Sequence, residues 1–142
     1  MRAAMLLPLA AFLTLGASPP QDASRPLCGS PARSATSYCT MVFFDAGSAE
    51  VARSAWPILD KVVAEIADNE ATQVVLTGHS DGPHDAPAAM ALSRRMAESV
   101  RDHLTQNGVD PALIAVEAHG ATQPRGTAAS ENRRVEIWVM WK

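Results

Sequence analysis

A turn bounded by glycines carries the residues whose types could do chemistry. Gly78-His79-Ser80-Asp81-Gly82 follows the compact apolar run 73–77 and has the G-x-S-x-G pattern of a nucleophile elbow, which presents a serine between a strand and a helix. Asp110 and His119 follow it in the Ser, Asp, His order of an α/β-hydrolase. One hypothesis is therefore a serine hydrolase that uses Ser80.

The surroundings of this turn argue against hydrolysis. A nucleophile elbow passes directly into a helix, whereas Gly82-Pro83-His84-Asp85-Ala86-Pro87 intervenes here. A hydrolase sheet with its pocket also needs a larger domain than the roughly 100 ordered residues expected in this chain. No glycine-rich oxyanion segment precedes the turn. We therefore predict a non-catalytic protein and keep hydrolysis by Ser80 as a remote alternative.

The histidines and cysteines do not form a metal or redox motif. The chain has four histidines without metal-ligand spacing, and Cys28 and Cys39 are too far apart for a C-x-x-C site. In an oxidising compartment this pair favours a disulfide, whose short loop is worth about 3 kcal/mol in the chain-entropy model. Two unpaired thiols in a loose segment are the alternative. No metal and no cofactor are expected.

The N-terminus has the features of a secretory signal. Arg2 precedes the apolar run Ala3–Leu15, and small residues and two prolines follow it. Pro8 lies inside the run, which is shorter than the about 20 apolar residues of a membrane-spanning helix. Cys28 lies well past the run and is not placed for lipid attachment. We expect a signal peptide at residues 1–23, with its cleavage position open. The mature protein is then expected in the periplasm, not inserted in a membrane but associated with the outer membrane or the cell wall.

Composition is that of an ordinary globular chain with one modest core. Of the 142 residues, 47% are hydrophobic and 19% are charged. The net charge is −3 and the pI is about 5.7, and basic residues cluster only in the pairs Arg94-Arg95 and Arg133-Arg134. Nucleic-acid binding relies on clustered Lys and Arg. A nucleic-acid partner is therefore not expected.

The elements that must position the turn can be read from apolar periodicity. Residues 24–39 are rich in Pro, Ser, Ala and Gly and are expected to be a linker that carries the disulfide. Compact or alternating apolar runs predict strands at residues 40–44, 73–77, 113–118 and 134–141.

Helical spacing predicts two helices between these strands. The first carries Leu59 to Ile66, with Ser54 as its N-cap and Pro57 in its first turn. The second runs over residues 88–106. The order β-α-β-α-β-β makes residues 40–142 one α/β domain, an α+β sandwich with both helices on one face of a mixed sheet.

Several short stretches share their order and spacing with one known family. They are Val42-Phe43-Phe44-Asp45, Ser48-Ala49-Glu50-Val51, Leu59-Asp60-Lys61, Gly78-His79-Ser80-Asp81, Leu92-Ser93 with Arg95 and Ala97, Gly108-Val109-Asp110-Pro111, Gly120 with Gln123-Pro124, and Asn132-Arg133-Arg134-Val135-Glu136. Together they resemble the OmpA-like C-terminal domain of outer-membrane proteins, Pal lipoproteins and flagellar stator proteins. The resemblance implies a domain that binds the peptide stem of peptidoglycan at diaminopimelate.

The resemblance also implies which residues form the site. Diaminopimelate carries an ammonium and a carboxylate, so its receptor needs an acid and a base a few ångströms apart. Asp81 matches the family's acid, and Ser80 precedes it in the same motif. Arg95, Asn132 and Arg133 match further family positions. A plain turn residue is the alternative for Asp81, and strand-edge solvation or loop anchoring for Asn132 and Arg133.

Met96 departs from the family pattern. The family's diaminopimelate-binding arginine lies directly before the alanine of the second helix, which is the position of Met96; Arg95 is one step and about 100° away. We expect Met96 at the edge of the apolar stripe, where an arginine would reach solvent. The alternative function is a scaffold that has lost diaminopimelate binding and instead binds a protein partner in the envelope.

Overall fold

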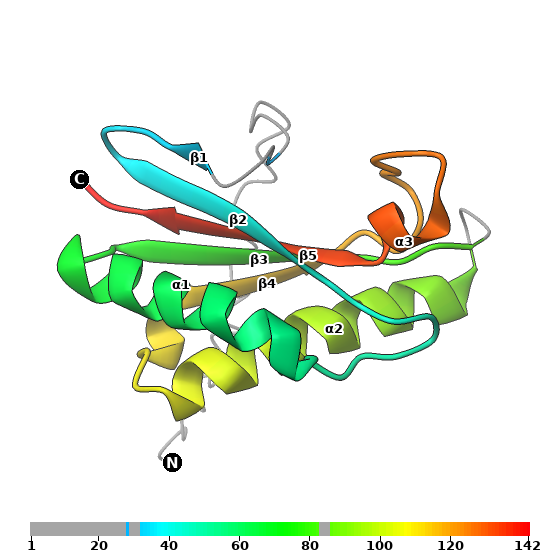
Figure 1. The fold of residues 1–142 in the computed structure, drawn as a ribbon, viewed down its shortest axis with the longest axis horizontal. Coiled ribbons are helices and arrows are strands. Elements are labelled where there is room, and N and C mark those ends of the chain that lie inside the picture. The colour runs from blue at the N-terminus through cyan, green and yellow to red at the C-terminus, as the bar shows by residue number, and fades with distance from the viewer. Residues whose placement is uncertain (1–27, 29–31, 83–85) are drawn as a thin grey trace, which may run out of the picture.

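The computed structural model describes residue 28 and residues 32–82 and 86–142 (Figure 1). The signal peptide predicted at residues 1–23 lies outside these ranges. Within them, no helix is long and apolar enough to cross a membrane.

The described strands form one mixed sheet in the order β1-β2-β5-β3-β4. They are β1 Ala32–Arg33, β2 Ser37–Phe43, β3 Gln73–His79, β4 Ile114–Ala118 and β5 Arg134–Met140. Strands β3 and β4 are parallel, and the other neighbours are antiparallel. The sheet starts earlier than predicted: β2 begins at Ser37, and β1 pairs with it from within the segment expected to be a linker. A strand of two residues leaves no periodicity to detect.

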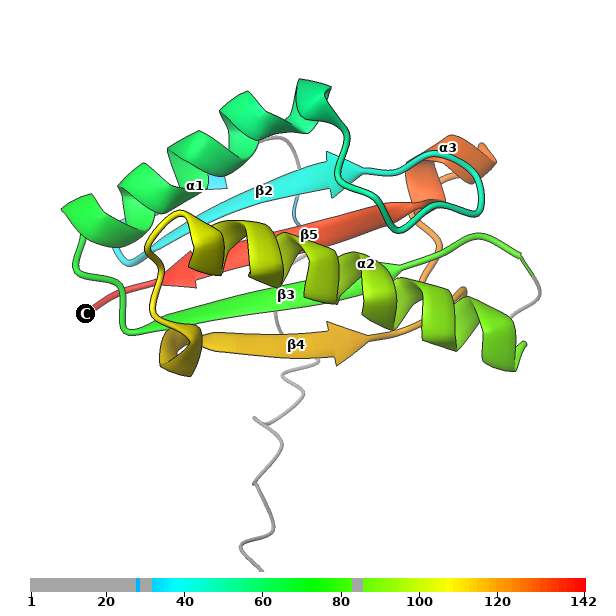
Figure 2. The same cartoon turned by 90° about the horizontal axis from the view of Figure 1, so that it is seen from below.

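Both long helices cover the same face of the sheet, as predicted (Figure 2). Helix α1 spans Trp56–Asp68 and α2 spans Pro87–Gln106. Pro57 lies in the first turn of α1, as expected, but the prediction of Ser54 as N-cap is wrong. Ser54 lies inside the 3₁₀ turn Arg53–Ala55, which runs straight into α1. Its backbone is already helical, whereas a capping residue is extended.

The core lies between the sheet and these two helices. Alternate residues of the strands face the helices and are buried, which confirms the predicted pattern of β5. The buried residues of the sheet include Val42, Val74, Leu76, Val135, Ile137 and Val139, and those of the helices include Leu59, Val62, Met96, Ala97, Val100 and Leu104. Gly78 allows α2 to approach β3 closely, because a Cβ there would overlap the carbonyl oxygen of Ser93. Burial of these apolar side chains is the main favourable term in folding.

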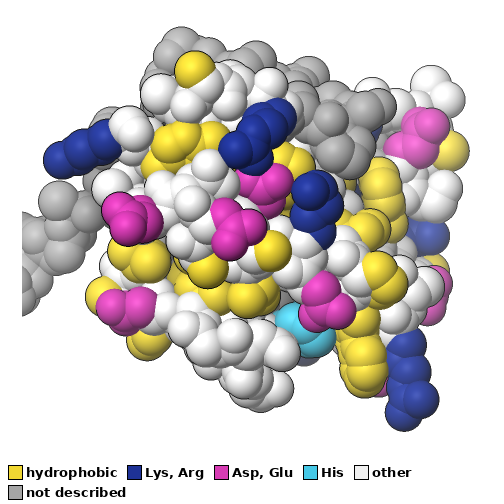
Figure 3. Space-filling model, turned by 60° about the vertical axis from the view of Figure 1, so that its left-hand side comes forward, with side chains coloured by type: hydrophobic (Ala, Val, Ile, Leu, Met, Phe, Trp, Pro, Cys, Tyr) yellow, Lys and Arg dark blue, Asp and Glu magenta, His cyan; other side chains and the backbone are white. Residues whose placement is uncertain are grey.

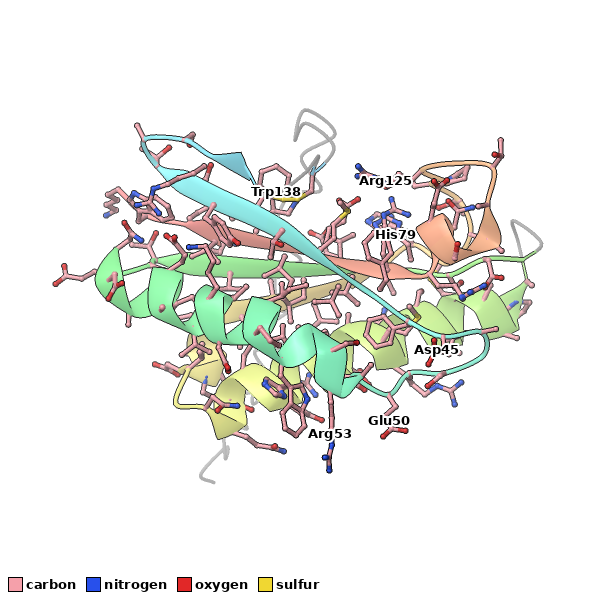
Figure 4. All side chains as sticks on the ribbon, in the orientation of Figure 1. Asp45, Glu50, Arg53, His79, Arg125 and Trp138 are labelled. Atoms are coloured by element: carbon pink, nitrogen blue, oxygen red, sulfur yellow. A yellow bond between two sulfur atoms is a disulfide. The ribbon has the colours of Figure 1, made fainter. Side chains whose placement is uncertain are left out.

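The face of the sheet away from the helices carries the disulfide. Cys28 and Cys39 are bonded, as predicted, with their Cα atoms 5.9 Å apart. Cys39 pairs in register with Trp138 of β5, and Figure 4 shows Trp138 beside the disulfide. Arg125 donates from Nη1 to the carbonyl oxygen of Cys28. Residue 28 is thus held against this face by one covalent bond and one hydrogen bond.

On the face shown in Figure 3, charges of both signs are interspersed. Among the described residues, the exposed large hydrophobic side chains are Phe43, Trp56, Ile58 and Met90. They come from β2, α1 and α2.

Candidate functional site

The structure brings Asp81 and Arg133 together at one end of the sheet. Asp81 comes shortly after β3 and Arg133 directly before β5, and these two strands are antiparallel neighbours. The Nη1 atom of Arg133 lies 3.2 Å from the Oδ2 atom of Asp81. The side chains are 15% and 31% exposed respectively, so a ligand can reach both from solvent. The pair places an acid and a base side by side, which are the two kinds of charged group that hydrogen-bond a carboxylate and an ammonium.

Arg133 is oriented by the backbone that follows β2. Its Nε donates to the carbonyl oxygen of Phe44 at 3.0 Å, and the Phe44 amide donates to the Arg133 carbonyl at 2.9 Å. Asp45, labelled in Figure 4, follows in the same loop. A guanidinium has five N–H donors in a planar fork. Among the described residues, Nε binds the Phe44 carbonyl and Nη1 binds Asp81, and Nη2 is a third donor group of the same guanidinium.

Ser80 is adjacent to the pair but does not present its side chain. It is 2% exposed, and its hydroxyl donates to the carbonyl oxygen of Ala89 at 2.8 Å. The structure therefore does not support the expected ligand contact through this hydroxyl, nor its use as a nucleophile. Of the other hydrolase candidates, Asp110 accepts from the Ala112 amide at 2.9 Å, as the cap of the 3₁₀ turn Pro111–Leu113.

Asn132 and Arg95 do not join the pair. Asn132 ends the short helix α3, Ala129–Asn132, and its side-chain amide binds the backbone of Arg125 and Gly126. This is the loop-anchoring role that the sequence left open as the alternative. Arg95 is exposed on α2, and within the described ranges no hydrogen bond or ion pair links it to Asp81.

Met96 is fully buried, so its expected place at the edge of the stripe is wrong. It is 0% exposed and belongs to the core cluster with Ala97 and Val100. The reason is the close approach of α2 to β3 at Gly78, which turns this side of the helix into the core. Position 96 therefore cannot offer a side chain to solvent, and the cationic partner of Asp81 is Arg133.

A buried polar cluster lies beside the site, on the face away from the helices. Arg134 is 0% exposed, and its Nε donates to Glu136 Oε1 at 3.0 Å. His79 pairs with Arg134 in register, is 1% exposed and stacks on His119 with ring centroids 5.3 Å apart. Burial, together with the charge of Arg134 and the proximity of His119, lowers the pKa of His79 to about 3. The imidazole is therefore neutral at physiological pH.

The sequence pattern did not predict this cluster, because it places His79 in the turn after the strand, whereas His79 is the last residue of β3. Within the described part of the chain, no group of three or more His, Cys, Asp or Glu side chains is arranged to hold a metal ion.

Comparison with known proteins agrees with the fold and with the family resemblance of the sequence. The profile of the OmpA family matches residues 43–137. A protein named peptidoglycan-associated lipoprotein from Pseudomonas aeruginosa is 33% identical over 103 residues, which cover 69% of this chain and 61% of that protein. Outer membrane protein A of Bordetella avium is 28% identical over 103 residues, covering 69% of this chain and 53% of its own length. The chain thus spans less than two thirds of these relatives.

Solved structures show the same architecture. The cell wall anchor of the T6SS from Pseudomonas aeruginosa superimposes with a TM-score of 0.67 at 26% identity, covering 80% of this chain and 87% of that chain. The peptidoglycan-associated lipoprotein from Burkholderia pseudomallei gives a TM-score of 0.65 at 23% identity, covering 70% and 89%, and shows likeness of fold alone. Since the family profile covers most of the described domain and its sheet and helices recur in these structures, the chain belongs to the OmpA family.

Proposed function

We propose that this domain binds the diaminopimelate-containing stem peptide of peptidoglycan without catalysing a reaction, and so holds the protein at the cell wall in the periplasm. The observation that carries the proposal is the Asp81–Arg133 pair, with its charged atoms 3.2 Å apart and both side chains partly exposed. Asp81 takes the ammonium of the ligand and Arg133 takes the carboxylate. The name of the Pseudomonas relative, peptidoglycan-associated lipoprotein, supports this assignment.

The energetics of the pair favour an exchange of partners. Binding replaces the single contact between Asp81 and Arg133 with a bond from each group to the ligand, so the new bonds offset the cost of separating the pair. Each charge-assisted hydrogen bond to the ligand is worth about 1.5–3 kcal/mol. Arg133 also keeps its Nε bond to the Phe44 carbonyl while its outer nitrogens bind the ligand. The guanidinium is therefore already oriented before binding, which limits the entropy lost.

The direct test is titration with a purified stem peptide, together with co-sedimentation with murein sacculi. Asp81→Asn and Arg133→Gln should each weaken binding about ten- to a hundredfold, because each removes one charge-assisted bond. Asp102→Asn is the matched control, since Asp102 is an α2 carboxylate whose side chain is 60% exposed and pairs with Arg101. Its affinity should equal that of the wild type.

A second test compares binding of two stem peptides that differ only in the residue at the diaminopimelate position. A stem peptide with lysine in place of diaminopimelate keeps the ammonium but lacks the extra carboxylate. It should bind the wild type more weakly than the diaminopimelate peptide, and Arg133→Gln should bind both equally. Equal binding of both peptides by the wild type would show that Arg133 does not bind the additional carboxylate of diaminopimelate.

A protein partner in the envelope is the second candidate function. The observation that favours it is Met96, which stands where the resemblance implies a ligand-binding arginine and is fully buried, so this position offers no cation to a ligand. If the wild type binds neither sacculi nor the stem peptide, this second function is preferred. Crosslinking in intact cells followed by identification of the captured protein would then name the partner.

A further inference from the structure

Two buried serines connect the Asp81 turn to helix α2. Ser80 precedes Asp81, and its hydroxyl donates to the carbonyl of Ala89 in the first turn of α2 at 2.8 Å. The Ser80 amide donates to the Gly120 carbonyl at 2.8 Å. The Gly120 amide in turn donates to the hydroxyl of Ser93 at 2.9 Å. These bonds form a chain from α2 through the loop after β4 to the residue next to Asp81.

Ser93 is the part of this chain with no exposure to water. It is 0% exposed, and its hydroxyl accepts from Gly120 while donating to the Met90 carbonyl at 2.8 Å. Gly120 has φ +55°, and a Cβ there would lie 3.2 Å from the Met90 nitrogen. The loop after β4 therefore packs directly against the first turns of α2. Removing the Ser93 hydroxyl would leave the Gly120 amide buried without an acceptor, which is costly.

We propose that Ser93 is a positioning residue for the Asp81–Arg133 site, acting through Gly120 and Ser80 to hold the Asp81 carboxylate beside Arg133. The proposal rests on the function proposed above and adds a residue that contacts neither charged group. It also gives Ser80 a different role from the one expected from its sequence motif. Ser80 fixes the backbone on the β3 side of Asp81, and Ser93 fixes the loop that holds Ser80.

The same helix provides a matched control. The hydroxyl of Ser99 donates to the Arg95 carbonyl at 2.9 Å, much as the Ser93 hydroxyl donates to Met90. Ser99→Ala therefore loses a bond to the helix's own backbone, as Ser93→Ala does, but leaves the Gly120 tie intact. A difference between the two variants reports the tie to the loop.

The first measurement needs no ligand. Native-state amide hydrogen exchange should show the Ser80 and Gly120 amides exchanging about tenfold faster in Ser93→Ala, beyond any change shared by the core amide of Leu76. Ser99→Ala should show no such local effect. Unchanged local exchange in Ser93→Ala would overturn the proposal. This measurement decides whether the tie exists even if the wild type proves not to bind peptidoglycan.

The second measurement is a double-mutant cycle with the stem peptide. Ser93→Ala should lower affinity several-fold when the folded fraction is the same, and the loss should vanish in an Asp81→Asn background because Asp81 is the group being positioned. An equal loss in both backgrounds would contradict the proposal. Gly120→Ala, which displaces the same loop from the other side, should reproduce the effect and provides a second variant if Ser93→Ala does not fold. A wild type that binds no peptide would refute the proposed function and leave the exchange result to stand alone.

Discussion

Protonation of His79 should make this domain sensitive to acid. The folded domain holds the pKa of His79 at about 3, against the usual 6.5, mainly because the ring is buried. The groups that face it are Arg134 on β5 and His119 after β4. The His119 ring stacks on His79, and its Nε2 atom lies 3.6 Å from Oε2 of Glu117. The positive charge of Arg134 also disfavours an imidazolium at this position.

The sign and size of the effect follow from proton linkage. Below pH 6.5 the unfolded chain takes up a proton at His79, whereas the folded domain does not until the pH approaches 3. The free energy of unfolding is therefore highest well above pH 6.5, where His79 is neutral in both states. It falls as the pH drops from there towards 3. Between pH 7 and pH 5 the loss should be about 2 kcal/mol. That is a large share of the about 5–15 kcal/mol that stabilises a typical domain.

The assay is urea unfolding at pH 7 and pH 5 for the wild type, His79→Phe and His79→Asn. Both variants remove the titrating group, and phenylalanine keeps a ring to stack on His119. Each should lose about 2 kcal/mol less than the wild type over this range. The reasoning is refuted if His79→Phe and the wild type lose the same free energy, or if NMR titration gives His79 a pKa near 6.

Two further predictions follow from burial and from the disulfide. Met96→Arg should lower the free energy of unfolding in urea by about 3 kcal/mol or more, because it buries an unpaired charge in the core. A stable variant that binds the stem peptide more tightly would contradict this and show that this side of α2 can open to solvent. Cys39→Ser should lower the free energy of unfolding by about 3 kcal/mol through loss of the Cys28–Cys39 bond, and thiol labelling of the unreduced, denatured wild type should find both cysteines blocked.

The sequence by itself determined the order of the elements, the apolar faces and the family. These features depend on local patterns. The alternation of Val135, Ile137 and Val139 gives a strand with one face in the core, and the helical spacing of Leu59, Val62 and Ile66 gives a helix with one buried side. The Cys28–Cys39 pair was also predictable, since the sequence offers no other cysteine to either partner.

Only the tertiary structure decided which side chains reach the site. Asp81 and Arg133 are 52 residues apart, and they meet because the end of β3 lies beside the start of β5. Met96 was assigned to the wrong environment. Its burial depends on how α2 is oriented about its own axis, and the close packing of α2 against Gly78 sets that orientation. The partner of the Ser80 hydroxyl could not be predicted either, because the Ala89 carbonyl that accepts it belongs to another element. Local pattern specifies which face of an element is apolar, whereas contacts between distant elements decide which polar atoms remain free to bind a ligand.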